Sequence, residues 1–179
     1  MTTQNALQDE LFKDRQRELV GDITPEAVHT LMLQLRCLQK QDPEKEITLY
    51  INSPGGRVSS GLALYDLMKA VKCPIRTVCV ELAASMAALL FASGDKRDIL
   101  PHGEVMIHDP LTTGISGSAL TVDSLSKSLM QSRQTMAEIL SQHTGRPLEE
   151  IYACTAKNTY FTAQEAVEFG MADRVIYEI

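Results

Sequence analysis

Leu49-Tyr50-Ile51-Asn52-Ser53-Pro54-Gly55-Gly56 is the stretch of sequence that decides the fold. It begins inside the short apolar run 47–51, which is typical of a buried strand, and it ends in a glycine pair. Adjacent glycines after a strand leave the backbone free to present N–H groups to a ligand. On its own, the segment 52–56 is better explained as a tight turn, because Asn, Ser, Pro and Gly all favour turns.

Outside this stretch, helix-like and strand-like segments alternate along the chain. The apolar spacing predicts helices over 25–40, 61–71, 83–92, 120–143 and 162–169 and strands over 47–51, 75–80, 103–107 and 174–176. Such alternation predicts an α/β domain in which helices flank a mainly parallel sheet. In a sheet of this kind, functional groups gather at strand ends and at helix N-termini.

Length and composition indicate one ordinary globular domain, residues 1–179. Hydrophobic residues make up 44% and charged residues 22%, and a net charge of −6 argues against nucleic acid or an anionic membrane as a partner. The most apolar stretch, 82–92, is too short to span a bilayer, and residues 1–10 show no secretory signal. We therefore expect a cytoplasmic protein.

Cysteine usage gives no sign of a metal site. The four cysteines form neither a CxxC motif nor a cluster with histidine. In a chain without an export signal we interpret them as buried thiols rather than as disulfides or metal ligands. They are Cys37, Cys73, Cys79 and Cys154.

Ser85 stands between a strand-like and a helix-like segment, in Ala83-Ala84-Ser85-Met86-Ala87-Ala88. A serine among small residues at a strand-to-helix turn resembles a nucleophile, and the helix N-terminus would help to stabilise an oxyanion. The segment is not the GxSxG elbow of the α/β-hydrolases. Taken alone, Ser85 is better explained as a helix N-cap, a role for which serine is preferred. The two roles are compatible.

His108 closes an apolar strand, in Met106-Ile107-His108-Asp109-Pro110. The other histidines have less suggestive places: His29 falls in a helix, His102 in a turn, and His143 near a helix C-terminus, where the dipole favours a cation. A lone histidine at a strand end is more often structural than catalytic. Whether His108 is catalytic therefore has to be judged together with the segments 52–56 and 83–88.

In this order, the three segments resemble the proteolytic subunit of the Clp protease, the ClpP family. The resemblance covers roughly residues 11–176 and is carried also by Leu64-Tyr65-Asp66 and by Ala163-Gln164-Glu165-Ala166-Val167-Glu168-Phe169-Gly170. It implies an α/β domain with the ClpP/crotonase-like fold, in which repeated β-α-β units form a head at about 11–109 and 145–179. A handle made of a strand and a long helix would protrude at about 110–144.

The resemblance also implies an active site. Ser85 would be the nucleophile, His108 its general base, and the backbone N–H groups of Gly56 and Met86 the oxyanion hole. His108 would remove the Ser85 proton, Ser85 would attack a peptide carbonyl, and water would later hydrolyse the acyl-enzyme. A serine endopeptidase of this type needs no metal and no organic cofactor.

The third member of the triad is where the chain departs from the family. The family's aspartate falls on Asn158, whose oxygen can hold the His108 ring but cannot stabilise its imidazolium by charge. Such a replacement can lower turnover by ~10⁴ in a peptidase built around aspartate. We therefore predict a weak or conditionally activated triad, Ser85-His108-Asn158. Asp109 is a poorer third member, because adjacent side chains of a strand point to opposite faces.

By the same resemblance, the subunits would assemble into heptameric rings that stack as a tetradecamer, either alone or mixed with a second ClpP paralogue. Segment 111–117 and helix 120–143 fall where the family carries the handle through which two rings meet, although a plain surface loop before a helix would fit the sequence equally well. An AAA+ unfoldase would bind ATP and deliver polypeptide substrates, since this chain has no P-loop pattern. Two features depart from the family's docking region: few residues precede position 11, and segment 15–18 is more charged than the family's apolar strand.

Two other readings compete with an active peptidase. The first is a catalytically weak regulatory subunit that assembles with an active paralogue, which the asparagine and the short amino terminus support. The second is an acyl-CoA-binding protein of the crotonase-like enoyl-CoA hydratase superfamily, which shares the fold but works with acidic residues. A membrane-anchored Ser-Lys peptidase is disfavoured, because the sequence offers no anchoring segment.

Overall fold

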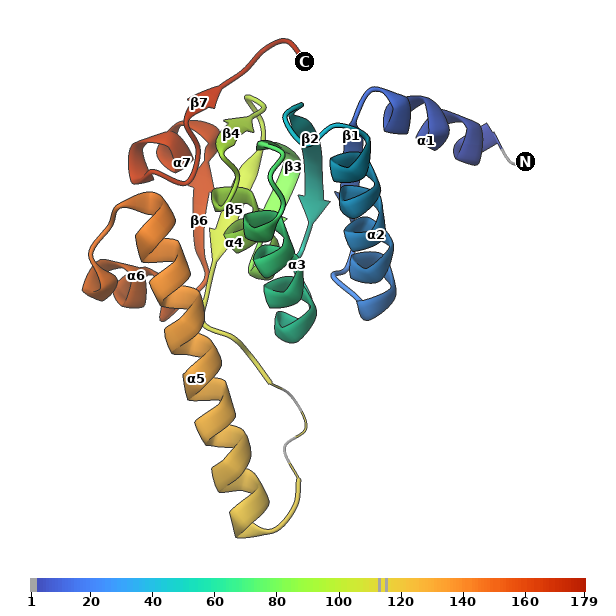
Figure 1. The fold of residues 1–179 in the computed structure, drawn as a ribbon. Helices are drawn as coiled ribbons and strands as arrows, with labels where there is room; N and C mark the ends of the chain where they lie inside the picture. The colour runs from blue at the N-terminus through green and yellow to red at the C-terminus, as the bar shows by residue number, and fades with distance from the viewer. Residues whose placement is uncertain (1–2, 113, 115) are drawn as a thin grey trace.

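One sheet of seven strands forms the centre of the computed structural model, which describes residues 3–112, 114 and 116–179 (Figure 1). The strands are β1 (Gln16–Val20), β2 (Ile47–Ser53), β3 (Ile75–Ala84), β4 (Lys96–Ile99), β5 (Glu104–Ile107), β6 (Thr159–Thr162) and β7 (Arg174–Val175). Their order is β1-β2-β3-β4-β7, and β5 and β6 extend the sheet from the second half of β3. Among the described strands only the pair β5–β6 is antiparallel. The prediction of an α/β domain with a mainly parallel sheet is confirmed.

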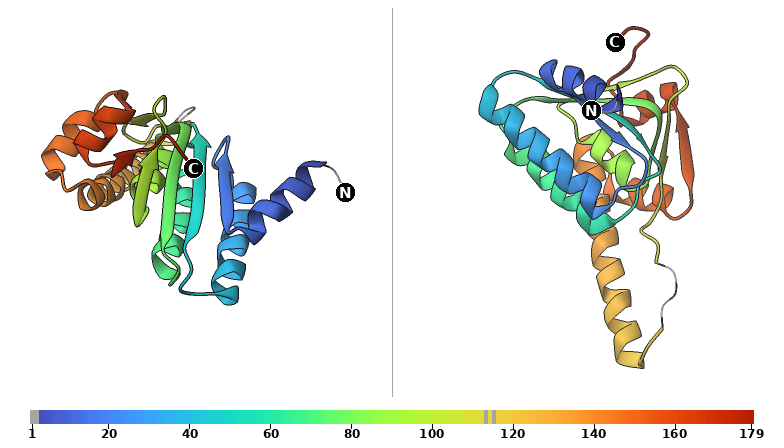
Figure 2. Two further views of the ribbon diagram at one scale, coloured as in Figure 1. Left: turned by 90° about the horizontal axis from the view of Figure 1, so that it is seen from above. Right: turned by 90° about the vertical axis from the view of Figure 1, so that its right-hand side faces the viewer.

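Helices cover the sheet and contribute most of the core. They are α1 (Thr3–Lys13), α2 (Pro25–Gln41), α3 (Val58–Ala70), α4 (Met86–Ala92), α5 (Ala119–Thr144), α6 (Leu148–Thr155) and α7 (Ala163–Phe169). α2 and α3 run side by side along the sheet (Figure 2). Helix α2 illustrates why these helices form. The Thr24 side chain caps its first turn by accepting a hydrogen bond from the Ala27 N–H. The apolar residues of α2 recur three and four positions apart, and they are buried against the core.

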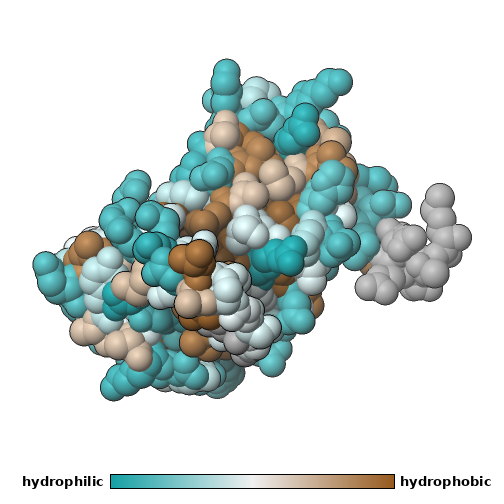
Figure 3. Space-filling view, turned by 90° about the horizontal axis from the view of Figure 1, so that it is seen from below, coloured by the Kyte–Doolittle hydropathy of each residue, from teal (hydrophilic) through white to brown (hydrophobic). Residues whose placement is uncertain are grey.

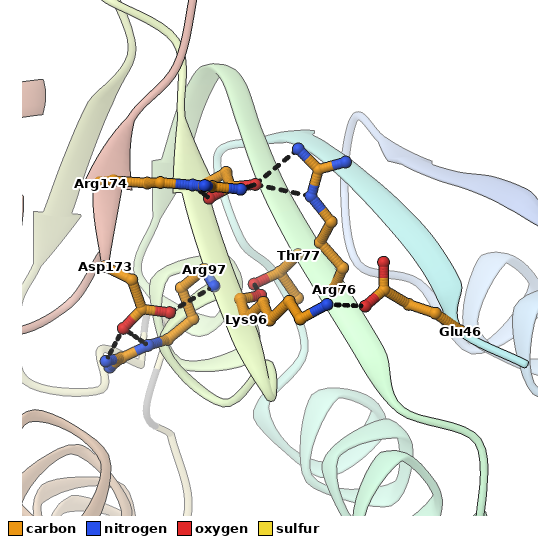
Figure 4. Close-up of polar contacts among 8 residues, drawn as sticks. Glu46, Arg76, Thr77, Lys96, Arg97, Asp173 and Arg174 are labelled. Atoms are coloured by element: carbon orange, nitrogen blue, oxygen red, sulfur yellow. Dashed lines mark hydrogen bonds and ion pairs between the residues drawn. The ribbon is translucent and has the colours of Figure 1, made fainter. Parts of the chain in front are cut away.

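Polar side chains also join the strands of the sheet to one another. Asp98, on β4, is 1% exposed, and it accepts hydrogen bonds from Arg76 on β3 and Arg174 on β7 at 2.6 Å and 2.8 Å. Figure 4 shows the two arginines converging from opposite sides and the neighbouring pairs of Lys96 with Glu46 and of Arg97 with Asp173. These side chains stabilise the junction of β3, β4 and β7.

Several sequence predictions need correction. The helix expected over 83–92 starts only at Met86, because Ala83 and Ala84 continue β3. The apolar spacing did not predict α1, β1, β4, α6 or β6, although the family resemblance places a strand at the position of β1. Strand β1 was missed because charged residues lie in it and directly before it. Arg15, the residue before the strand, is only 4% exposed. Its guanidinium donates to the backbone carbonyl oxygens of Leu38, Asp42, Lys45 and Glu46. A buried guanidinium there organises backbone rather than marking a solvent-exposed segment.

The long helix α5 extends well beyond the rest of the fold (Figures 1 and 2). Large apolar side chains remain exposed on its first half and on the segment before it, including Leu111 at 74% and Leu120 at 82%. Figure 3 looks at this end of the molecule and shows hydrophobic residues gathered around the middle of the face. The strand expected over 111–117 does not form at its described positions, while 113 and 115 lie outside the described residues.

The cysteines are all free thiols, but the prediction that they are buried is wrong for Cys37, which is exposed, and only partly right for Cys154. Burial raises the pKa of the Cys79 thiol to about 12, so this side chain stays protonated and unreactive. Among the described helices, none is both long and apolar enough to cross a membrane.

Candidate active site

Ser85 sits at a sharp turn between β3 and α4. Its backbone has φ 55° and ψ −121°, a conformation that a non-glycine residue adopts at a cost of about 1–3 kcal/mol. It holds the N-cap position of α4, yet its hydroxyl makes no capping hydrogen bond. The hydroxyl instead lies 2.8 Å from Nε2 of His108. The turn thus orients the side chain toward His108 rather than toward its own helix.

A change of neighbour along β3 brings these two residues together. The first half of β3 pairs with β4 as far as Cys79, and its last residues pair with β5, so that Ala84 lies opposite Met106. One residue further, the Ser85 N–H donates to the Met106 carbonyl oxygen at 2.7 Å. Because β3 and β5 are parallel neighbours, Ser85 and His108 emerge from the same edge of the sheet.

Asn158 reaches His108 through the antiparallel pair β5–β6. Ile107 lies opposite Thr159 in this pair, so the residues just beyond, His108 and Asn158, also face each other. The Asn158 side-chain oxygen lies 3.1 Å from Nδ1 of His108. With that oxygen as acceptor, Nδ1 carries the ring proton and Nε2 is left to accept from the Ser85 hydroxyl. Asn158 is exposed to solvent, whereas His108 is half-buried.

Asp109 takes no part in the hydrogen-bonded series of Ser85, His108 and Asn158. Its carboxylate accepts from Nε of Arg133 on α5 at 2.7 Å, and the Arg133 guanidinium lies 4.2 Å above the centre of the Tyr152 ring on α6. The Asp109 N–H donates to the Thr155 carbonyl oxygen at 2.7 Å. As expected for adjacent strand residues, the Asp109 and His108 side chains have separate partners. Asp109 and Arg133 were not recognised from the sequence as a pair, because 24 positions separate them.

The glycine pair packs against the Ser85 turn. A Cβ atom on Gly55, whose φ is +96°, would lie 2.7 Å from the Ala84 carbonyl oxygen and 2.8 Å from Cβ of Ser85. A Cβ atom on Gly56 would lie 2.7 Å from the backbone of Ile23. Only residues without side chains allow the chain to approach the turn so closely. The tight-turn explanation of 52–56 needs correction, because Asn52 and Ser53 continue β2 and Gly56 forms a parallel bridge with Ile23.

Two backbone N–H groups in the segments around the Ser85 turn are without a hydrogen-bond acceptor among the described residues. The Ile23 N–H donates to the Gly55 carbonyl oxygen, and the Ile23 carbonyl oxygen accepts from the Arg57 N–H. The N–H of Gly56, which lies between these two residues, therefore points away from Ile23. Met86 occupies the first position of α4, where a helix offers its N–H no internal acceptor. Among the described residues, neither the Gly56 nor the Met86 N–H has a hydrogen-bond acceptor. An oxyanion hole requires N–H groups that are free in this way.

The other candidate groups lie elsewhere. His29 and His102 are exposed, and His143 is half-buried with Nε2 3.4 Å from the Tyr65 hydroxyl. Burial, followed by the nearby Lys69 and Arg97 cations, lowers the pKa of His143. Over the described part of the chain, no three His, Cys, Asp or Glu side chains gather in a way that could hold a metal ion.

Comparison with known families gives one match over nearly the whole chain. The family model described as Clp protease matches residues 2–178. The matched stretch contains every residue of the site, from Gly56 to Asn158.

Proposed function

Because the chain belongs to the Clp protease family, we propose that it is a serine endopeptidase subunit of a ClpP-type ring chamber, cutting peptide bonds in unfolded polypeptides. The observation that carries this proposal is the 2.8 Å contact between the Ser85 hydroxyl and Nε2 of His108 at a strained strand-to-helix turn. Strained backbone of this kind is concentrated at active sites and ligand-binding sites.

The proposed reaction follows from these atoms. Nε2 of His108 takes the Ser85 proton as the serine oxygen attacks the peptide carbonyl carbon, and the carbonyl oxygen becomes an oxyanion. The N–H groups of Gly56 and Met86 donate to that oxyanion. His108 then gives its proton to the leaving amine, which departs and leaves an acyl-enzyme. Water, deprotonated by His108, hydrolyses the ester and returns the proton to Ser85.

Asn158 limits the rate of this reaction. It orients the ring through one neutral hydrogen bond at 3.1 Å, and it adds no negative charge to stabilise the imidazolium that forms. Its exposure leaves this bond open to competition from water. We propose a slow peptidase whose rate rises in any assembly that excludes water from Asn158.

The family generally forms rings with AAA+ partners. For this chain we propose heptameric rings, stacked as a tetradecamer or mixed with a second ClpP paralogue, with an AAA+ unfoldase that binds the ATP. The apolar side chains left exposed on α5, such as Leu120, support a contact between two rings through this helix, the proposed handle. A cytoplasmic location stays a prediction from the sequence.

A regulatory subunit is the second candidate, and the neutral, exposed Asn158 is the observation that favours it. Acyl-CoA chemistry has less support, because the nearby carboxylates already have partners. Glu81 accepts from the Asn52 side chain at 2.7 Å, and Asp109 accepts from Arg133.

Hydrolysis of a fluorogenic peptide by the assembled protein tests the proposal. Wild type should cleave the peptide slowly, and Ser85→Ala and His108→Ala should abolish cleavage without changing the assembly seen by size-exclusion chromatography. If wild type is inactive alone, mixed rings with an active paralogue carrying its own serine-to-alanine change would reveal any activity contributed by Ser85. Equal rates for wild type and Ser85→Ala in both settings would refute catalysis and favour the regulatory role.

A further inference from the structure

A cleft of about 280 Å³ opens between α3, α5 and the segment that follows His108. Its walls combine apolar side chains, serine hydroxyls and one arginine. Among the lining residues are Arg57, Ser59, Pro110, Leu111, Leu125 and Ser128.

The cleft adjoins the candidate active site through two short connections. Arg57 directly follows Gly56, whose N–H is available to an oxyanion, and Gly55 packs against Ser85. On the other wall, Pro110 comes two residues after His108. A polypeptide whose carbonyl group reaches Ser85 would therefore place a neighbouring side chain in or beside this cleft.

Among the described residues that line this cleft, Arg57 is the one that carries a charge. It is exposed and forms no salt bridge among the described residues. One carboxylate that feels its charge is Glu26, in the first turn of α2. Backbone and Thr24 hydrogen bonds lower the pKa of the Glu26 carboxyl group, and Arg57 adds a smaller lowering. Asp109 and Arg133, which adjoin the lining residues Pro110 and Ser132, form an ion pair with each other at 2.7 Å. The cleft therefore carries a positive charge that the fold itself leaves largely available.

We propose that Arg57 makes this cleft a subsite for an acidic side chain of the polypeptide substrate, an inference that rests on the peptidase activity proposed above. A glutamate fits the lining: its methylene groups can pack on Pro110 and Leu125 while its carboxylate meets the guanidinium, which binds carboxylates with two parallel hydrogen bonds. A lysine in the same place would be repelled. Arg57 is thus a specificity-determining residue, and the geometry of Ser85 does not depend on its charge.

The expected preference is modest, because Arg57 is exposed. Ion pairs in such places correspond to at most about fivefold in binding or rate, and the preference should fade in 1 M salt, where the screening length falls to about 3 Å. Loss of the preference in salt separates a charge effect from a fit of shape.

The test maps cleavage sites. Wild type, Arg57→Gln and Arg57→Glu would digest the same library of unfolded peptides, and mass spectrometry would give the residue preference at each position on both sides of the cut. Arg36→Glu, an equal charge change on the exposed surface of α2, serves as the matched control. A fluorophosphonate that carries no peptide would be reacted with each variant to measure Ser85 independently of substrate.

Wild type and Arg36→Glu should enrich Glu and Asp at one position, by up to about fivefold over Gln. Arg57→Gln should remove the enrichment, and Arg57→Glu should replace it with Lys and Arg at the same position, while all four proteins label equally with the fluorophosphonate. An acidic preference that survives Arg57→Glu, or no charge preference in a protein that cleaves and labels, overturns the role of Arg57 and leaves the peptidase intact. Absence of both cleavage and labelling overturns the peptidase, and the subsite with it.

Discussion

Replacing Asn158 with aspartate should accelerate the peptidase, since it adds the charge that the site lacks. The side-chain oxygen already lies 3.1 Å from Nδ1 of His108, and aspartate has nearly the same shape. The new carboxylate would accept from the Nδ1–H in the orientation present now, and it would also fix the ring tautomer that leaves Nε2 unprotonated.

The size of the effect depends on how well water screens the new charge. Two unit charges 3.1 Å apart interact by about 5 kcal/mol at an effective dielectric constant of ~20 and by about 1 kcal/mol in bulk water. Because Asn158 is exposed, we expect the lower part of this range, about 1–3 kcal/mol. That corresponds to a gain of about 5- to 150-fold in kcat/KM.

Steady-state hydrolysis of a fluorogenic peptide between pH 5 and 9 provides the assay. Since the carboxylate favours the imidazolium, the acidic limb of the kcat/KM profile should also move to higher pH in Asn158→Asp. Asn158→Ala is the matched control and should be slower than wild type, because it removes the hydrogen bond that holds the ring. If both variants equal wild type in rate and pH profile, Asn158 does not act on His108 during turnover and the reasoning is wrong.

Three further substitutions probe other parts of the structure. Gly55→Ala should lower kcat/KM by about 10²-fold and also lower Tm, because a methyl group there collides with the Ser85 turn and a positive φ strains alanine. An unimpaired variant would show that the turn tolerates displacement. Arg133→Met should lower kcat about fivefold with KM unchanged, because the ion pair with Asp109 holds the end of the strand that precedes His108. Arg133→Lys should restore part of the lost kcat, and an equal effect on KM would contradict this positioning role. Asp98→Asn should lower the free energy of unfolding at pH 7 by about 3 kcal/mol, since it leaves two arginines around a buried neutral amide. Burial alone would raise the pKa of Asp98, but hydrogen bonds from Arg174 and Arg76 outweigh it, so the pKa lies below its ordinary value. The stabilisation by the Asp98 carboxylate is therefore complete above about pH 4 and is lost as the pH falls through the lowered pKa. In urea unfolding, the difference in free energy of unfolding between wild type and Asp98→Asn should be smaller at pH 3 than at pH 7.

The sequence was informative where one periodicity dominates. The apolar spacing of α2 and the capping residues around α7 predicted both helices to within a few residues, because their stop and start signals are local. Short strands such as β4 and β6 have only four residues each, and the pairing that defines them comes from distant segments. Strand β1 was missed because a buried Arg15 next to it looks like a surface charge in the sequence.

The candidate site was predictable as a set of residue types but not as a geometry. Ser85, His108 and Asn158 were proposed from their motifs, and the structure brings their polar atoms to within 2.8 Å and 3.1 Å of one another. The switch of β3 from β4 to β5 that makes this approach possible depends on long-range pairing, which no local pattern reports. The cleft beside Arg57 has the same origin, since its walls come from segments more than 50 residues apart.

The most direct measurement is the intact mass of the assembled protein after exposure to a fluorophosphonate probe, with Ser85→Ala and His108→Ala alongside. We expect one adduct on wild type, none on Ser85→Ala and little on His108→Ala, because only a serine activated by a neighbouring base reacts readily with such a probe. An adduct that persists in Ser85→Ala would place the nucleophile elsewhere. No adduct on wild type, alone or in a mixed ring, would contradict the assignment of Ser85 as an activated nucleophile.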